Sequence, residues 1–109
     1  MGTSRSAEEK TWTAGASIFS GHPDPAWPVP AAMGEGLAKR WEGLSEWFGE
    51  RPEPPPLGYR GCHLAAPDGR DFAVFRELVR LGAEARRDAE REFERAVLAS
   101  APPGTLPPH

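Results

Sequence analysis

The sequence has too few cysteines for an internal disulfide, because Cys62 is the only one in 109 residues. A chain without disulfides suits a reducing compartment best. The sequence also lacks an apolar run that approaches the roughly 20 residues of a membrane span, and no signal-peptide core follows the polar stretch MGTSRSAEEK. These absences predict a cytoplasmic protein with no membrane partner.

An excess of charge of one sign is missing as well. The formal net charge is −3, and acidic and basic residues are mixed along the chain. A protein that grips phosphate backbones would carry a basic surface, and a nucleotide site would show a glycine-rich phosphate loop. Neither is present, so we expect no nucleic-acid partner.

Tryptophan and proline are plentiful instead, with four and 13 residues. The tryptophans lie in the first half and argue against its disorder, since disordered chains are poor in large aromatic side chains. The prolines are clustered, which is typical of stiff connectors and tails. A chain of this length can bury one core. We therefore predict a flexible arm over residues 1–10, one domain over 11–100 and a proline-rich tail over 101–109.

Two different periodicities organise the first half of the predicted domain. Apolar and polar side chains alternate over residues 12–20, which predicts a half-buried strand. Apolar side chains recur every three or four positions over residues 31–48, which predicts a helix that ends before Gly49 and Pro52. The proline-rich segment between these two elements is expected to be extended.

The second half begins with a predicted hairpin, because the Pro-Asp-Gly sequence at 67–69 presets the backbone angles of a tight turn. Its arms are expected near residues 58–66 and 70–76. Residues 71–81 would also fit one side of a helix, and this alternative stays open. Periodic apolar residues among alternating charges predict a helix over 84–99.

The predicted elements follow the order strand, helix, strand, strand, helix. This order is typical of an α+β domain, in which a small antiparallel sheet carries helices packed on one face. The charged residues of the last helix are expected to form a solvated face rather than a pair of catalytic carboxylates.

Few residues offer metal or nucleophile chemistry. Cys62 and His63 are adjacent, so on a strand they would point to opposite faces and could not bind one metal together. Cys62 could act as a nucleophile, with His22 or His63 as its base and Asp24 as the group that orients the base. A lone cysteine is more commonly a packed side chain. We therefore expect no metal, no cofactor and no catalytic residue, and the sequence favours a protein that is not an enzyme.

One pair of segments is unusual. Trp27 stands between prolines, and it would present a large aromatic surface at little entropic cost, either as an interface anchor or as a clamp onto the core. Some thirty residues later, Tyr59 precedes Arg60, which could stack on Tyr59 or on Trp27.

These two segments resemble a signature of small uncharacterised bacterial proteins, in which SGRPNPxW is followed later by GYRG. The first part covers Ser20 to Trp27 and the second covers Gly58 to Gly61. The chain departs from the signature with His22 in place of arginine, Asp24 in place of asparagine and Cys62 in place of an aromatic residue. The resemblance implies no named activity.

We therefore predict a non-catalytic accessory or protein-binding module, whose partner is a larger biosynthetic or peptide-modifying enzyme. The alternative is a small enzyme or small-ligand carrier with a pocket near His22, Asp24, Tyr59 and Arg60. Homo-oligomer formation stays open. The predicted binding surface consists of His22, Asp24, Trp27, Tyr59, Arg60 and His63.

Overall fold

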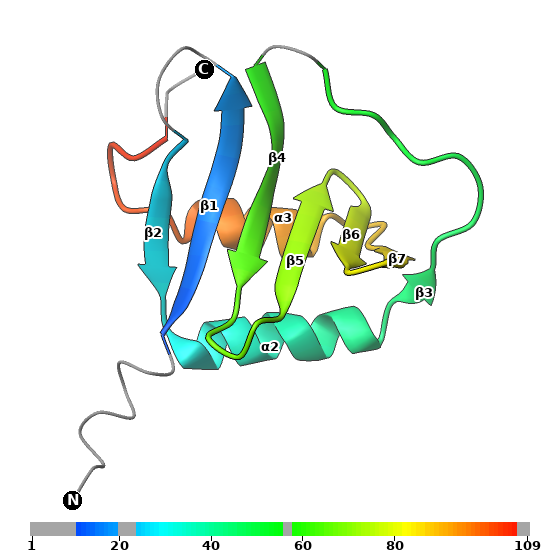
Figure 1. Cartoon of the computed structure of the whole chain (residues 1–109), viewed down its shortest axis with the longest axis horizontal. Coiled ribbons are helices and arrows are strands. Elements are labelled where there is room, and N and C mark those ends of the chain that lie inside the picture. The colour runs from blue at the N-terminus through cyan, green and yellow to red at the C-terminus, as the bar shows by residue number, and fades with distance from the viewer. Residues whose placement is uncertain (1–10, 20–23, 56–57, 107–109) are drawn as a thin grey trace, which may run out of the picture.

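The computed structural model describes residues 11–19, 24–55 and 58–106. In these ranges the chain forms one seven-stranded antiparallel sheet and two helices (Figure 1). The strands lie in the order β2-β1-β4-β5-β6-β7-β3, so β2 and β3 are the two edges of the sheet. The elements along the chain are β1 (Trp12–Phe19), β2 (Ala26–Val29), α2 (Ala31–Glu42), β3 (Ser45–Glu46), β4 (Gly58–Ala65), β5 (Asp71–Phe75), β6 (Leu78–Leu81), β7 (Glu84–Arg87) and α3 (Glu92–Ala99).

The predicted α+β class, with its small sheet and helices packed on one face, is wrong. The described chain is mostly β, because it contains four strands besides the three predicted ones. β2 forms in the proline-rich segment, and β3 forms within the range of the first predicted helix. β6 lies between the predicted hairpin and the predicted last helix, and β7 takes the first four residues of that helix. The strands predicted near 12–20, 58–66 and 70–76 are confirmed as β1, β4 and β5.

The first helix ends six residues earlier than its hydrophobic period indicates. Gly43 forms its C-cap, and the guanidinium of Arg86 on β7 donates hydrogen bonds to the carbonyl oxygens of Trp41 and Glu42 at 3.3 and 2.7 Å. These carbonyls belong to the last turn, where helix bonding leaves them without a partner. Arg86 therefore caps α2 from the neighbouring sheet and allows the next residues to pair with β7.

The last helix starts eight residues later than its composition indicates. Residues 84–87 form β7, which pairs antiparallel with β6 from Leu78↔Arg87 to Leu81↔Glu84. Gly82, at φ 61°, lies in the turn between the two strands. Pairing with β6 thus overrides the helix propensity of an alternating charged sequence, as tertiary context commonly does.

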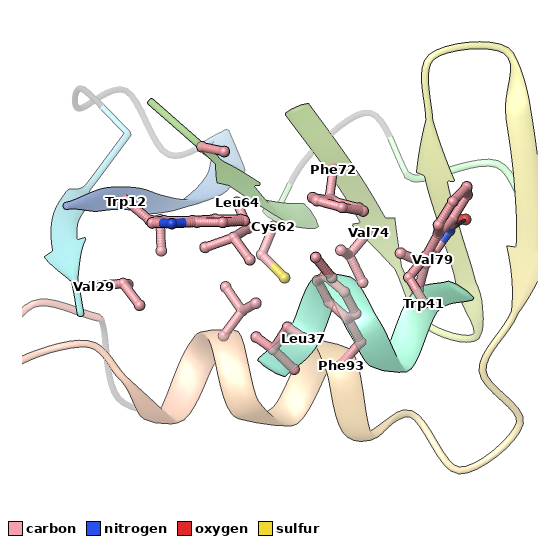
Figure 2. Packing of buried hydrophobic residues seen from close by; sticks show 14 of the residues in the cluster. Trp12, Val29, Leu37, Trp41, Cys62, Leu64, Phe72, Val74, Val79 and Phe93 are labelled. Carbon is pink, nitrogen blue, oxygen red and sulfur yellow. Dashed lines mark hydrogen bonds between the residues drawn. The ribbon is translucent and has the colours of Figure 1, made fainter. Parts of the chain in front are cut away.

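The core lies between the sheet and the helices. Figure 1 shows α3 crossing behind β1, β4 and β5. Figure 2 shows Leu37 from α2 and Phe93 from α3 directed toward the strand residues Leu64 and Phe72. Trp41 meets Phe72 edge to face, and its indole nitrogen donates a 3.0 Å hydrogen bond to the carbonyl oxygen of Val79. Each helix is therefore fixed to the sheet by an aromatic side chain.

The predicted tail begins inside the packed structure, since Ala101 and Leu106 are partly buried against the core. Within the described ranges, neither α2 nor α3 has the length and apolar character that a membrane-crossing helix needs.

Two glycines in α2 give a matched test of the packing. A Cβ atom at Gly34 would overlap the indole ring of Trp12, whereas a Cβ at Gly36 would meet no atom within 4 Å. Gly34→Ala should therefore destabilise the protein by about 1–3 kcal/mol through overpacking. Gly36→Ala should stabilise it by roughly 0.5–1 kcal/mol through helix propensity. Urea unfolding followed by tryptophan fluorescence measures both, and equal stabilities for the two variants would contradict this packing of α2 on β1.

Candidate functional site

Trp27 is a structural clamp. It lies on β2 opposite Ala14, its side chain is 3% exposed, and its indole nitrogen donates a 2.8 Å hydrogen bond to the hydroxyl of Ser100 at the end of α3. The ring is therefore unavailable as an interface anchor in this conformation. The sequence left two roles open for Trp27, an interface anchor and a clamp onto the core, and its contacts in the structure are those of a clamp.

Tyr59 is turned toward the helices by a β-bulge. Ala16 pairs with Cys62 and Ile18 pairs with Tyr59, so one residue of β1, Ser17, opposes two residues of β4, Arg60 and Gly61. The extra residue places Tyr59 on the same face as Cys62, which an uninterrupted strand would not do. Gly61 takes up the bulge at φ 117°. The Tyr59 hydroxyl then donates a 2.7 Å hydrogen bond to a carboxylate oxygen of Glu94 on α3.

The other predicted binding residues point elsewhere. Asp24 accepts a 2.9 Å hydrogen bond from the backbone N–H of Ile18, and Arg60 donates one of 2.9 Å to the carbonyl oxygen of Pro55. His63 lies on the opposite side of the sheet from the core, in a depression that it shares with Asp71 and Arg80. His22 lies outside the described residues.

The predicted binding surface is therefore not brought together. β1 separates Trp27 from Tyr59, and Tyr59 and His63 occupy opposite faces of the sheet. The end of β1 does lie beside the start of β4, because Phe19 pairs with Gly58. The resemblance to the bacterial signature stays a prediction, because the geometry of the described residues does not test a sequence signature.

Glu94 is the centre of a buried polar network. Its side chain is 3% exposed and accepts hydrogen bonds from the Tyr59 hydroxyl, from the backbone N–H of Arg76 at 3.1 Å and from the guanidinium of Arg91 at 2.8 Å. Burial by itself would raise the pKa of this carboxyl, but the hydrogen bonds from Tyr59, Arg91 and Arg76 outweigh it, and the pKa is lowered. The network therefore holds a carboxylate anion inside the fold.

Cys62 lies next to this network and is not activated. Its side chain is 4% exposed, and burial raises the pKa of the thiol to about 12. Burial beside Cys62 and Glu94 also raises the pKa of Tyr59 well above its ordinary value. At neutral pH both groups are protonated, which is the opposite of what a thiolate nucleophile requires. Within the described ranges, no group of three or more His, Cys, Asp or Glu side chains could hold a metal ion.

A different set of residues forms the best candidate for a functional surface. We call it the β3 corner, and it consists of Trp47, Phe48, Arg51, Arg76 and Arg87. Phe48 is the one large hydrophobic side chain that the structure leaves exposed among the described side chains, with 77% of its surface accessible. Phe48 directly follows Trp47, which lines one depression together with the three arginines. Aromatic residues and arginine are enriched at protein interfaces.

The corner is held rigidly against the sheet edge. The backbone N–H of Trp47 continues the β3–β7 pairing with a 3.0 Å bond to the carbonyl oxygen of Ala85, and its indole nitrogen donates to the carbonyl oxygen of Glu50 at 3.3 Å. The guanidinium of Arg87 lies 4.3 Å from the centre of the Trp47 ring and forms a 3.2 Å ion pair with Glu77. These contacts fix the indole in one position.

A depression of about 380 Å³ opens beside Trp47. Its walls are Trp47, Pro52, the acidic residues Glu50 and Glu77, and the three arginines of the β3 corner. An aromatic wall with several cations suits a binding surface for a polar segment of another molecule. The sequence did contain a signal for this corner, because two aromatic residues precede Gly49 and a stiff proline-rich run. Both fall within residues 31–48, where the apolar period predicts a helix, so the period assigns them to that helix.

The Glu94 network predicts a pH dependence of stability. Its folded-state pKa lies below the unfolded value of about 4.3, so the stabilisation is present above that value and is lost as the pH falls through it toward the folded pKa. Glu94→Gln should reduce the free energy of unfolding by about 1–3 kcal/mol at pH 7 and make its decline below pH ~5 shallower. Urea unfolding at several pH values measures this, and parallel curves for parent and variant would contradict it.

Cys62 should resist alkylation in the folded protein. Because the thiol is buried and protonated at pH 8, iodoacetamide should modify native protein at least ~100-fold more slowly than protein unfolded in urea. Mass spectrometry of quenched samples follows the reaction. Labelling of native Cys62 at the rate of the unfolded chain would show that the thiol is accessible and would reopen the nucleophile interpretation.

Comparison with known proteins adds no family to this description: the chain matches no protein-family model, no curated protein and no solved structure.

Proposed function

We propose that the chain is a non-catalytic accessory module that binds a protein partner through the β3 corner. The observation that carries the proposal is the exposure of Phe48, at 77%, in a fold that buries its other large apolar side chains wholly or in part within the described ranges. An exposed aromatic side chain contributes nothing to the core, yet it gains roughly 1.5–3 kcal/mol when a partner covers it.

The surroundings of Phe48 support a role as an interface anchor. Trp47 is half-buried and immobilised by Arg87 and by its bond to Glu50, so docking would cost little further side-chain entropy. Pro52 and Pro54 follow closely, and prolines restrict the backbone of the adjoining loop. Figure 1 shows this loop extending outward from β3. A pre-formed aromatic and cationic surface is what a binding module needs.

The buried groups support the non-catalytic part of the proposal. The Tyr59 hydroxyl is engaged by Glu94, and the Cys62 thiol is protonated. A larger biosynthetic or peptide-modifying enzyme is the kind of partner that we propose, because it would supply the catalytic groups. We place the complex in the cytoplasm, where a lone buried thiol stays reduced. No contact in the described ranges favours the alternative of a ligand pocket around Asp24, Tyr59 and Arg60.

The proposal is tested at Phe48 itself. Phe48→Ala should leave the free energy of unfolding within about 0.5 kcal/mol of the parent, because the side chain is exposed, and should weaken partner binding by roughly tenfold or more. A photo-crosslinking amino acid placed at position 48 in the native host should give one discrete, saturable protein adduct.

The matched control is the same crosslinker at Lys39, which is exposed on α2. Position 39 should give no such adduct, and purified Phe48→Ala protein should compete poorly for the partner. Equal labelling at positions 39 and 48, or no saturable adduct at 48, would contradict a partner surface at the β3 corner.

A further inference from the structure

We infer that the β3 corner recognises an extended peptide segment in which a carboxylate lies beside an apolar side chain. This inference rests on the proposed function and specifies the chemistry of its partner. Phe48 provides the apolar contact, and the arginines that line the neighbouring depression provide the cationic one.

The first observation is the backbone of Arg76. It occupies the first position of the two-residue turn between β5 and β6, where Phe75 pairs with Leu78, and its φ is 57°. Turns of this kind favour Gly, Asn or Asp at that position, since other residues pay a conformational penalty there. An arginine thus occupies a position at which its backbone conformation is disfavoured.

The second observation is that no carboxylate among the described residues pairs with the guanidinium of this arginine. Its guanidinium lies 5.0 Å from the centre of the Phe75 ring, but it forms no ion pair within the described ranges. Arg91 is the other described non-glycine residue at positive φ, at 58°, and its guanidinium is bound to the buried Glu94 at 2.8 Å. The strained backbone of Arg91 therefore accompanies an internal ion pair, whereas that of Arg76 accompanies a cation that lines the depression and has no ion-pair partner in the described part of the chain.

The third observation is the balance of charge at the depression. Arg87 is paired with Glu77. Of the other charged residues that line the depression, Arg51 and Arg76 have no carboxylate partner in the described chain, and Glu50 is the one acid there without a cationic partner. The site is thus locally cationic in a protein whose net charge is −3. A carboxylate partner would remove this local imbalance, and guanidinium groups bind carboxylates with short charge-assisted hydrogen bonds.

An extended segment fits better than a folded surface because the corner lies at the edge of the sheet. β3 has only two residues and pairs with β7 on one side, so a short peptide can lie along its outer side. Side chains then alternate in direction, which allows neighbouring residues of the peptide to reach Phe48 and the depression.

A random dodecapeptide library displayed on phage is the probe, panned against the full chain at about 50 mM salt, where charge pairing is weakly screened. Enriched peptides should carry Asp or Glu next to an aromatic or branched aliphatic residue. A fluorescein-labelled synthetic copy of the most enriched peptide is then titrated by anisotropy, and its affinity should fall as salt is raised.

Arg76→Gly separates recognition from folding. Glycine adopts φ 57° readily, so the melting temperature should equal or exceed that of the parent, while the Kd for the peptide should rise by about tenfold or more. Arg76→Gln, which keeps the disfavoured backbone, should weaken binding similarly without raising the melting temperature. Arg80→Gln is the matched control, because Arg80 is exposed on β6 and forms no ion pair in the described chain; its Kd should be unchanged.

The outcomes distinguish this inference from the proposed function. Peptides that lack acids but lose binding in Phe48→Ala would overturn the carboxylate inference and leave the protein-binding surface standing. Binding that is equal in the parent and in Arg76→Gly would also overturn it. A library that yields no peptide would overturn recognition of an extended segment, while the crosslink at position 48 still decides whether the corner binds a folded partner.

Discussion

The buried carboxylate of Asp88 connects the parts of the fold on which the rest of the structure depends. The residue is 1% exposed, and its two oxygens accept 2.7 Å hydrogen bonds from the guanidinium of Arg40 on α2 and from the backbone N–H of Phe93 on α3. Its own N–H donates to the carbonyl oxygen of Glu77. Burial would raise the pKa of this carboxyl, but Arg40 and the backbone of Phe93 outweigh it, so the group is an anion that joins both helices to the β5–β6 turn.

This anchoring determines where the β3 corner lies. Asp88 follows β7 directly, so fixing it also fixes the strand that carries Arg86 and Arg87. Arg86 lies 4.3 Å over the Trp41 ring and ends α2, and Arg87 covers Trp47. The two adjacent arginines of β7 thus act on different parts of the fold. Arg86 caps the C-terminal end of α2, and Arg87 packs against Trp47 at the edge of the sheet. The exposed Phe48 is a consequence of the early end of α2.

Local signals in the sequence were enough for some elements and not for others. The Pro-Asp-Gly turn at 67–69 correctly predicted the β4–β5 hairpin, because its backbone requirements are local. The helical period through Phe48 and the charged run from Glu84 were misleading, since α2 is ended by Arg86 from a strand distant in sequence and β7 is held by β6. The site prediction failed to anticipate the bulge at Gly61, which turns Tyr59 inward, for the same reason: a bulge depends on the register with β1, which no local pattern encodes.

The edges of the sheet explain why recognition would involve side chains at one corner. β2 carries Pro28, which has no N–H to offer a neighbouring strand, so this edge is a poor template for pairing with another chain. The opposite edge, β3, is only two residues long and is followed by a loop that Arg60 ties to β4 through Pro55. Pairing with a strand of another chain is therefore disfavoured along β2, and along β3 it can involve only a few residues. Under the proposed function, specificity at such a short edge comes from the groups that flank it. Among the residues that the structure describes, those are an exposed phenyl ring and two arginines without a carboxylate partner.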